Sequence, residues 1–300
     1  MSFVILDLEW NAAFSKKRGK YINEIFEFGA VKLDDNRNII DRFSVLVKPT
    51  IGKFMNPYVK KLTNLTFADL KDSDMNFQQA ISAFAEFLGD SILMTWSTSD
   101  LLALLENQNY FTGSDKIPFL TRYCDLQSYC EHILGVGSAS RQLGLSTCAE
   151  LVLISQEFEH HRALSDAELS ALCFKKLFKK SVFDEFIEDA SVEEFYRKLT
   201  FKSKHITDLR NPLVDRSQMF FDCPECSARC VQKSKWNVRS RSFKAFFVCP
   251  ECKKEFAGQV FVKQKYEGVV FTKKIVEPAP EVAENADNST ENTASVADNA

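Results

Sequence analysis

Two short segments, Cys223-Pro224-Glu225-Cys226 and Cys249-Pro250-Glu251-Cys252, repeat one pattern of four residues, with 22 residues between them. A Cys-x-x-Cys turn directs two thiolates to one point, so two such turns supply the four sulfur ligands of a closed tetrahedral zinc site. A redox-active dithiol needs only one pair, and the repeat therefore favours one structural Zn²⁺ ion. The surrounding chain must fold so that all four cysteines converge.

The segment 216–276 around these cysteines resembles a zinc ribbon, a short β-sheet module. It contains 13 Lys and Arg residues and 5 Asp and Glu residues, whereas the tail 277–300 contains six acidic residues and no basic one. A basic block beside an acidic tail indicates a polyanionic partner. The tail has no aromatic residue and is rich in Glu, Asn, Ala, Thr and Ser, so we expect it to be disordered.

Basic and aromatic residues are interleaved between the two cysteine pairs. Phosphates are bound by Lys and Arg, and bases stack on aromatic rings, so such a segment is typical of single-strand binding. In the alternative, the aromatic residues only fill a small core and the ribbon docks to a protein, which the sequence does not identify. The residues that we predict to bind nucleic acid are Lys233, Lys235, Trp236, Arg239, Arg241 and Lys244.

The segment 1–183 has the pattern of one mixed α/β domain. Its expected strands are 3–8, 24–33, 39–47 and 92–96, with a hairpin turn at 34–38, and its expected helices are 77–88, 101–107 and one with an apolar stripe from Leu164 to Phe178. A charged connector, 184–215, follows, with helical potential at 191–199. No apolar run approaches the ~20 residues of a membrane span, so we expect no membrane partner. Unpaired cysteines beside a zinc site favour a reducing, cytoplasmic location.

Carboxylates recur at three places in this domain. Asp7 and Glu9 are two residues apart on the first expected strand, so both side chains leave one face and repel each other unless a cation intervenes. Asp100 follows the strand 92–96 and opens a helix. Ser165 and Glu168 fit a capping box, which would place Asp166 in the first turn of the next helix. Each acid by itself is also compatible with a solvated strand end or a helix N-terminus.

Joined in order, Asp7-x-Glu9, Asp100 and His161-x-x-x-x-Asp166 resemble the three motifs of the DEDDh 3′–5′ exonucleases. The segment 23–31, Asn-Glu-Ile-Phe-Glu-Phe-Gly-Ala-Val, is similar to that family's second strand. Thr95-Trp96-Ser97-Thr98-Ser99-Asp100 resembles the T-W-G-x-x-D of the ERI-type and KapD-type branch, with Ser97 in place of glycine.

The resemblance implies a ribonuclease H-like α/β fold, with a mixed five-stranded sheet flanked by helices. It implies that Asp7, Glu9, Asp100 and Asp166 hold two Mg²⁺ or Mn²⁺ ions and that His161 is the general base. The implied activity is 3′–5′ exonucleolytic hydrolysis of single-stranded RNA or DNA from the 3′ end, with RNA preferred and nucleoside 5′-monophosphates as products.

Two other functions stay open. One is a DNA-trimming or proofreading exonuclease that uses the same site. The other is a non-catalytic RNA-binding scaffold, which is disfavoured because all five catalytic positions are occupied by the residues that the motifs require.

Overall fold

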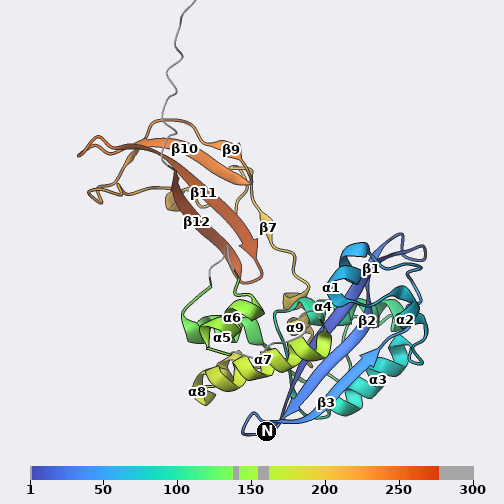
Figure 1. Ribbon diagram of the computed structural model, residues 1–300. Coiled ribbons are helices and arrows are strands. Elements are labelled where there is room, and N and C mark those ends of the chain that lie inside the picture. The colour runs from blue at the N-terminus through green and yellow to red at the C-terminus, as the bar shows by residue number, and fades with distance from the viewer. Residues whose placement is uncertain (1, 138–141, 155–161, 277–300) are drawn as a thin grey trace, which may run out of the picture. The chain divides into compact units, whose positions relative to one another are not determined.

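The first sheet is built around β1 (Phe3–Ser15), whose alternating side chains are buried on both faces over its first half. The computed structural model describes residues 2–137, 142–154 and 162–276 (Figure 1). The strand order is β3-β2-β1-β4-β5-β6. Strands β1, β2 and β3 pair antiparallel, β4 and β5 run parallel to β1, and β6 closes the edge antiparallel to β5. The sheet is therefore mixed, as predicted.

The elements of this part of the chain have the following bounds. The strands are β1, β2 (Lys20–Leu33), β3 (Ile39–Leu46), β4 (Ile92–Thr95), β5 (Arg122–Asp125) and β6 (Glu188–Asp189). The helices are α1 (Pro57–Thr63), α2 (Phe67–Lys71), α3 (Phe77–Leu88), α4 (Ser99–Thr112), α5 (Leu126–Leu134), α6 (Leu145–Leu151), α7 (Ala163–Leu177), α8 (Lys180–Phe183) and α9 (Glu193–Leu199), with a 3₁₀ turn η1 at Asp184–Phe186.

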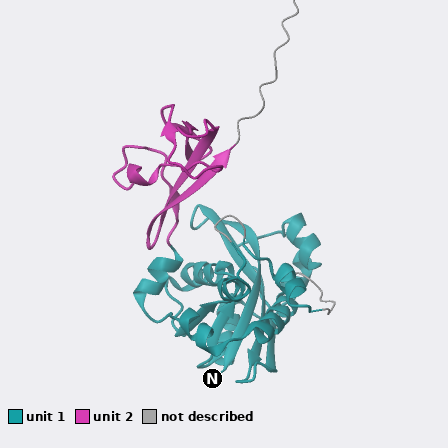
Figure 2. Ribbon diagram, turned by 90° about the vertical axis from the view of Figure 1, so that its left-hand side faces the viewer, with its two compact units in different colours: residues 1–200 teal, residues 201–300 magenta. Residues whose placement is uncertain are grey.

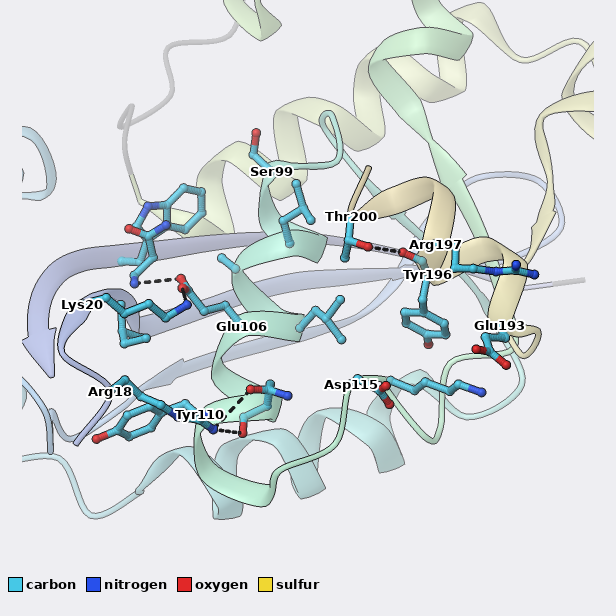
Figure 3. Close-up of a pocket in the computed structure, with 18 residues that line it drawn as sticks. Arg18, Lys20, Ser99, Glu106, Tyr110, Asp115, Glu193, Tyr196, Arg197 and Thr200 are labelled. Atoms are coloured by element: carbon cyan, nitrogen blue, oxygen red, sulfur yellow. Dashed lines mark hydrogen bonds and ion pairs between the residues drawn. The ribbon is translucent and has the colours of Figure 1, made fainter. Parts of the chain in front are cut away.

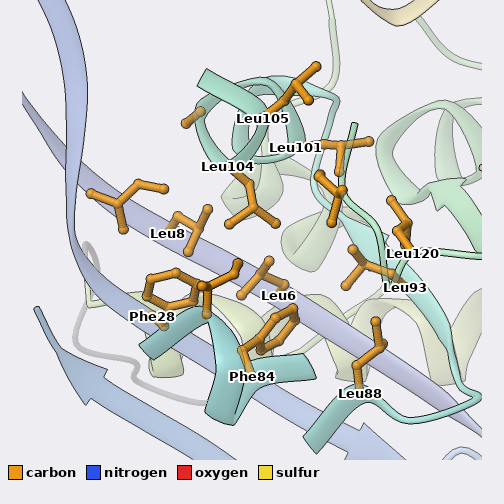
Figure 4. Packing of buried hydrophobic residues seen from close by; sticks show 14 of the residues in the cluster. Leu6, Leu8, Phe28, Phe84, Leu88, Leu93, Leu101, Leu104, Leu105 and Leu120 are labelled. Atoms are coloured by element: carbon orange, nitrogen blue, oxygen red, sulfur yellow. The ribbon is translucent and has the colours of Figure 1, made fainter. Parts of the chain in front are cut away.

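Helices cover both faces of this sheet. Leu6 and Leu8 point to one face and pack with Phe84 of α3 and Leu104 of α4 (Figure 4). On the other face, Phe3 packs edge-to-face against Phe174 of α7, with ring centroids 5.4 Å apart. The sequence of the first part of β1 is a continuous apolar run because both faces of this part are buried.

The structure differs from the prediction in two details of the sheet. It adds β6, so the sheet has six strands where five were predicted, although β6 spans only two residues. The β1–β2 hairpin also extends well beyond residues 8 and 24. The outer part of β1 contains Asn11, Ala12 and Ala13 in place of a β-branched run, and it is held by pairing with β2 rather than by its own propensity. The helix 77–88 and the turn 34–38 are confirmed.

The chain divides into two compact units, 1–200 and 201–300 (Figure 2). Ala190, Phe195 and Tyr196 belong to the same buried cluster as Leu6 and Leu8. The first unit therefore continues past residue 183, where the sequence predicted the end of the first domain.

The second unit is a β-sheet module. Its strands are β7 (Lys204–His205), β8 (Val231–Gln232), β9 (Asn237–Arg239), β10 (Ser242–Val248), β11 (Glu255–Lys265) and β12 (Gly268–Val276), with a 3₁₀ turn η2 at Arg216–Gln218. The order is β12-β11-β10-β8, and β7 and β9 add to β11 and β10. Phe243, Phe247 and Phe256 lie in its core. The tail 277–300 is outside the described residues. In the described parts of both units, no helix combines the length and the hydropathy of a membrane span.

Candidate metal-binding active site

The first part of the site lies beside β1, at the point where the neighbouring strand β4 ends. The last residue of β4, Thr95, pairs with Leu6, so Leu8 lies two residues beyond the end of the ladder. The backbone N–H of Leu8 donates a hydrogen bond to Oδ1 of Asp100 at 2.9 Å. Asp100 therefore satisfies a buried donor that β4 leaves without a strand partner. This bond fixes the start of α4 against the segment of β1 between Asp7 and Glu9.

A close approach of helix α7 to the sheet places the other acidic residue. Asp7 pairs across the ladder with Gly29 of β2. A Cβ atom on Gly29 would lie 2.0 Å from the backbone nitrogen of Leu164, so only glycine lets the first turn of α7 lie directly on the sheet here. That turn carries Asp166. Ligand oxygens of Asp7, Glu9 and Asp166 consequently lie within 4.8 Å of one another.

The start of α7 differs from the prediction. The helix begins at Ala163, with Arg162 as its N-cap residue and no side-chain cap hydrogen bond. The predicted capping box at Ser165 and Glu168 is therefore wrong, because both residues lie inside the helix. The Glu168 carboxylate instead accepts a hydrogen bond from Nε of Arg42 at 2.6 Å. Asp166 is nevertheless in the first turn, as expected.

An ion pair anchors the start of α7 in place of that box. The guanidinium of Arg162 donates from Nη2 and Nε to Oε1 of Glu27, at 2.9 and 3.1 Å. Glu27 is 1% exposed and is the cross-strand neighbour of Glu9. Sequence reasoning missed this pair, although an acid within the apolar run of β2 was a usable signal, since a buried carboxylate needs a partner.

The carboxyl groups of Asp7, Glu9 and Asp100 have raised pKa values. Burial, followed by the charges of Asp100, Asp166 and Glu9, raises the pKa of Asp7 well above its usual value. Burial, followed by the charge of Glu27, raises the pKa of Glu9 to about 8. Burial raises the pKa of Asp100 to about 7, against the lowering effect of the hydrogen bond from Leu8. Clustered carboxylate oxygens of this kind are the donors that hard divalent cations require.

A cavity of about 670 Å³ lies beside α4 (Figure 3). Its wall includes Trp10 and Ser99, which are the sequence neighbours of Glu9 and Asp100. Nζ of Lys20 lies 3.6 Å from Oε1 of Glu106 on this wall, and the figure shows Tyr196 and Arg197 on its far side. The four carboxylates themselves are not among the residues that line this cavity.

The predicted general base lies outside the described residues. His161, together with its neighbour His160, falls in the segment 155–161. Its predicted role therefore stays a prediction from the motif.

The four cysteines of the second unit converge. Sγ of Cys223 lies 3.4 Å from Sγ of Cys252, and Sγ of Cys226 lies 3.4 Å from Sγ of Cys249. Four thiolates at about 2.3 Å from one Zn²⁺ ion in a tetrahedron are about 3.8 Å apart, so the cluster matches that geometry closely. This fit supports the predicted zinc ribbon.

Both cysteine turns have the same backbone. The N–H of Cys223 donates to the carbonyl of Ala228, and the N–H of Cys249 donates to that of Lys254, at 2.8 and 2.9 Å. Ser227 and Lys253, each the residue after the second cysteine of its turn, have φ values of 61° and 62°. The repeated sequence pattern thus corresponds to a repeated local structure.

The remaining residues predicted in the ribbon do not share one environment. Trp236 packs against Phe247, with ring centroids 5.7 Å apart, at the border of the core. The side chain of Trp236 is half-buried, so its predicted role in binding stays a prediction. Lys233, Lys235, Arg239 and Arg241 are exposed, and Lys244 is half-buried.

A mixed sheet with helices on both faces and a carboxylate cluster at the end of a central strand is the architecture expected of a metal-dependent nuclease. The family model described as RNase_T, exonuclease, matches residues 4–174. The chain belongs to this exonuclease family. The match confirms the predicted family, the ribonuclease H-like fold and the class of enzyme, a phosphodiester hydrolase of the exonuclease type.

Curated relatives include DNA polymerase III PolC-type of Clostridium perfringens, which is 29% identical over 197 residues. That match covers 62% of this chain and 12% of the relative, so the chain spans about an eighth of the length of that protein. DNA polymerase III subunit epsilon of Aquifex aeolicus is 28% identical over 193 residues, with 63% of this chain and 86% of the relative covered.

The solved structures that match this chain in part include the nuclease domain of 3′hExo, described as a DEDDh family member bound to rAMP. It has 19% identity and a TM-score of 0.49, and the match covers 62% of this chain and 96% of that one. Exonuclease I of E. coli, in complex with a dT13 oligonucleotide, has 14% identity and a TM-score of 0.45, with 82% of this chain and 55% of that one covered.

Proposed function

We propose that this chain removes nucleotides from the 3′ end of single-stranded nucleic acid by metal-dependent hydrolysis, with RNA as the preferred substrate. The observation that carries the proposal is the convergence of Asp7, Glu9 and Asp166 within 4.8 Å, beside an anchored Asp100. Three half-buried carboxylates at this separation repel one another, and a divalent cation would compensate their charge. The same convergence argues against a non-catalytic scaffold.

In this proposal, Asp7, Glu9 and Asp166 would hold the divalent ions together with Asp100. Mg²⁺ or Mn²⁺ in such a site supplies charge neutralisation at the phosphate and makes water a stronger nucleophile. The protein contributes rigidity, because Asp7 and Glu9 lie on a central strand and the Glu27–Arg162 pair holds the helix that carries Asp166. His161 accepts the proton of the attacking water, a role that suits a group with a pKa near neutrality.

Different observations support RNA and DNA as the substrate. The resemblance of the segment 95–100 to the ERI-type branch favours RNA. The curated relatives are named as parts of DNA polymerase III, which favours a DNA-trimming exonuclease that uses the same residues. The RNA preference is therefore the finer part of the proposal and needs its own test.

The test is hydrolysis of matched single-stranded RNA and DNA oligonucleotides labelled at the 5′ end, with Mg²⁺ or with Mn²⁺. We expect a ladder that shortens from the 3′ end, nucleoside 5′-monophosphate as the product, and faster cleavage of RNA. EDTA added just before the substrate should abolish the ladder. Faster cleavage of DNA would establish the alternative, and a ladder that persists in EDTA would overturn the metal-dependent mechanism.

The role of His161 is tested with two neighbouring substitutions. His161→Ala should lower the turnover number by roughly 10²-fold or more, the usual scale for the loss of a general base. The rise of the wild-type rate with pH through the histidine range should disappear in this variant. His160→Ala is the matched control, and a larger loss in that variant would show that the motif is misaligned by one residue.

A further inference from the structure

The two faces of the sheet in the second unit have different surroundings. In the β10–β11 ladder, Phe243 pairs with Val260 and Phe247 pairs with Phe256, and all four side chains are buried. Phe221 packs on the same face, where a Cβ atom on Gly258 would lie 2.5 Å from its ring. This face, the core face, is therefore covered by the unit's own chain.

The opposite face, which we name the open face, is formed by the alternate residues of the same strands. Pairing places Lys244 opposite Gln259 and Gln259 opposite Lys274, and it places Phe261 beside them on β11. Among the described strand residues 237–276, the acid on this face is Glu255, at the end of β11. Its basic residues are Arg239, Lys244, Lys263, Lys265 and Lys274. The open face is thus strongly basic.

Two aromatic rings lie among these basic side chains. Phe246 is on the same face as Lys244, two residues along β10, and 53% of its surface is exposed. The ring of Phe261 has Nζ of Lys274 at 5.8 Å from its centroid and the ring of His205 at 6.4 Å. A phenylalanine that packs a core loses its contact with water, as Phe243 and Phe247 do. Phe246 is available for stacking instead.

We propose that the open face binds single-stranded nucleic acid, with the phosphates bound by its Lys and Arg residues and with bases stacked on Phe246 and Phe261. Flat rings flanked by cations match the alternating bases and phosphates of a strand whose bases are unpaired. A protein-docking face is the other candidate, but the centres of such interfaces are depleted of lysine. Charge therefore favours nucleic acid over a protein.

This surface is a second binding site, formed by the second unit alone, and it adds to the ribbon residues predicted from the sequence. Trp236 is not part of the open face, because its ring packs against Phe247 of the core face. The open face adds four residues to the predicted ones: Phe246, Phe261, Lys263 and Lys274. The inference rests on the proposed function only in the choice of a strand with a free 3′ end.

Binding is measured with the full chain carrying Asp7→Asn, so that cleavage does not interfere. The probes are single-stranded RNA and DNA of about 20 nucleotides with a fluorescent 5′ label, and the readout is anisotropy across a salt series. Lys244→Ala combined with Lys274→Ala should weaken binding and should reduce the slope of log affinity against log salt by about 1.4, since each phosphate contact contributes about 0.7. Phe246→Leu should weaken binding about tenfold with little change in slope. Phe246→Tyr, which keeps an aromatic ring, should bind as the wild type does.

The matched control is Lys204→Ala combined with Lys253→Ala, which removes the same charge from the same unit. Lys204 pairs with Gln264 on the core face, and Lys253 lies in the second cysteine turn. An equal loss of affinity and slope in this control would show that only net charge matters and would overturn the proposal. Unchanged binding in Phe246→Leu would overturn the proposed stacking of bases on this ring. Each variant must retain its zinc, which reports that the unit is folded.

Failure of this inference and failure of the proposed function are distinguishable. With Asp7 intact, the open-face variants should cleave a short oligonucleotide of about five residues as the wild type does. Binding as expected without any cleavage by the wild type would leave the open face supported and refute the exonuclease proposal alone. Normal cleavage with binding unaffected by the open-face substitutions would refute the open-face inference and leave the exonuclease proposal supported.

Discussion

The two candidate metal-binding clusters of this protein are built in opposite ways. The carboxylates come from residues 7, 9, 100 and 166 and lie where the central strand β4 ends, in a sheet with a buried hydrophobic cluster on each face. The cysteines come from residues 223–252, in a unit with one buried cluster that includes Cys223 and Cys249 themselves. A metal at the first site would act on a fold that other contacts already hold, whereas we expect a metal at the second site to contribute to the stability of the fold.

The largest expected effect is the loss of the second unit without its metal. Cys249→Ser should unfold residues 201–276, because structural zinc contributes an apparent free energy of about 10–16 kcal/mol in small modules. Amide hydrogen exchange should show protection lost in this unit and retained in the first. Cys230→Ser is the matched control: Cys230 is buried in the same unit but lies outside the cluster of four. Retained protection in Cys249→Ser would break the contrast between the two sites.

At the first site, removal of a ligand should abolish activity and spare the fold. Asp7→Asn removes a carboxylate from the group that lies within 4.8 Å, and we expect cleavage to fall by at least about 10²-fold. Circular dichroism and hydrogen exchange should match the wild type. A variant that is folded and fully active would remove Asp7 from the proposed site.

A smaller effect is expected at the contact that brings α7 to the sheet. Gly29→Ala places a methyl group against the backbone of Ala163 and Leu164, so it should cost about 3 kcal/mol and displace Asp166. Denaturant unfolding and cleavage assays should both report a loss. Gly144→Ala is the control, because a Cβ there meets nothing closer than 3.8 Å. Equal stability of the two variants would mean that the approach of α7 is not tight.

The carboxylates should also affect the stability of the folded protein. Burial and neighbouring acids raise the folded-state pKa of Asp7, and they raise that of Glu9 to about 8. The folded state then binds more protons than the unfolded state between pH 4 and 8, so this stabilising contribution is present at low pH and is lost as pH rises through that window. In buffer without Mg²⁺ or Mn²⁺, we expect Asp7→Asn to melt above the wild type, with a gap that widens from pH 5 to pH 8.

A marked loss of melting temperature in Asp7→Asn under those conditions would contradict this prediction. It would show that the Asp7 carboxylate stabilises the fold, as we expect the four cysteines to do in the second unit, and the contrast between the two sites would then not hold.

The smallest effect is expected at Ser97, which replaces the glycine of the resembling motif. Its φ of 73° is costly for a residue with a side chain. Glycine would relieve that cost but would lose the hydrogen bond from Ser99 N to the Ser97 hydroxyl. Ser97→Gly should therefore raise the free energy of unfolding by only about 0.5 kcal/mol, with unchanged activity. Ser99→Gly, in the first turn of α4, should lower it. Thermal unfolding distinguishes the two.

Much of this protein can be predicted from short stretches of sequence. The Cys-x-x-Cys pairs determine two turns, because the spacing of two ligands within four residues leaves few backbone conformations. Asp7 and Glu9 share a face because strand side chains alternate, and the helix 77–88 follows from its apolar periodicity. These features depend on the residue dihedral angles and on neighbours only a few positions away.

The tertiary structure decided the features that join distant segments. The contact of Gly29 with Leu164, the pairing of Glu27 with Arg162 and the hydrogen bond from Leu8 to Asp100 each link residues that no local pattern connects. The exposure of Phe246 and the burial of Phe247 were likewise undetermined, because a run of aromatic residues does not state which face of a strand will be covered. Packing against chain elements far away in the sequence makes that choice, since the face that finds apolar partners is the one that leaves water.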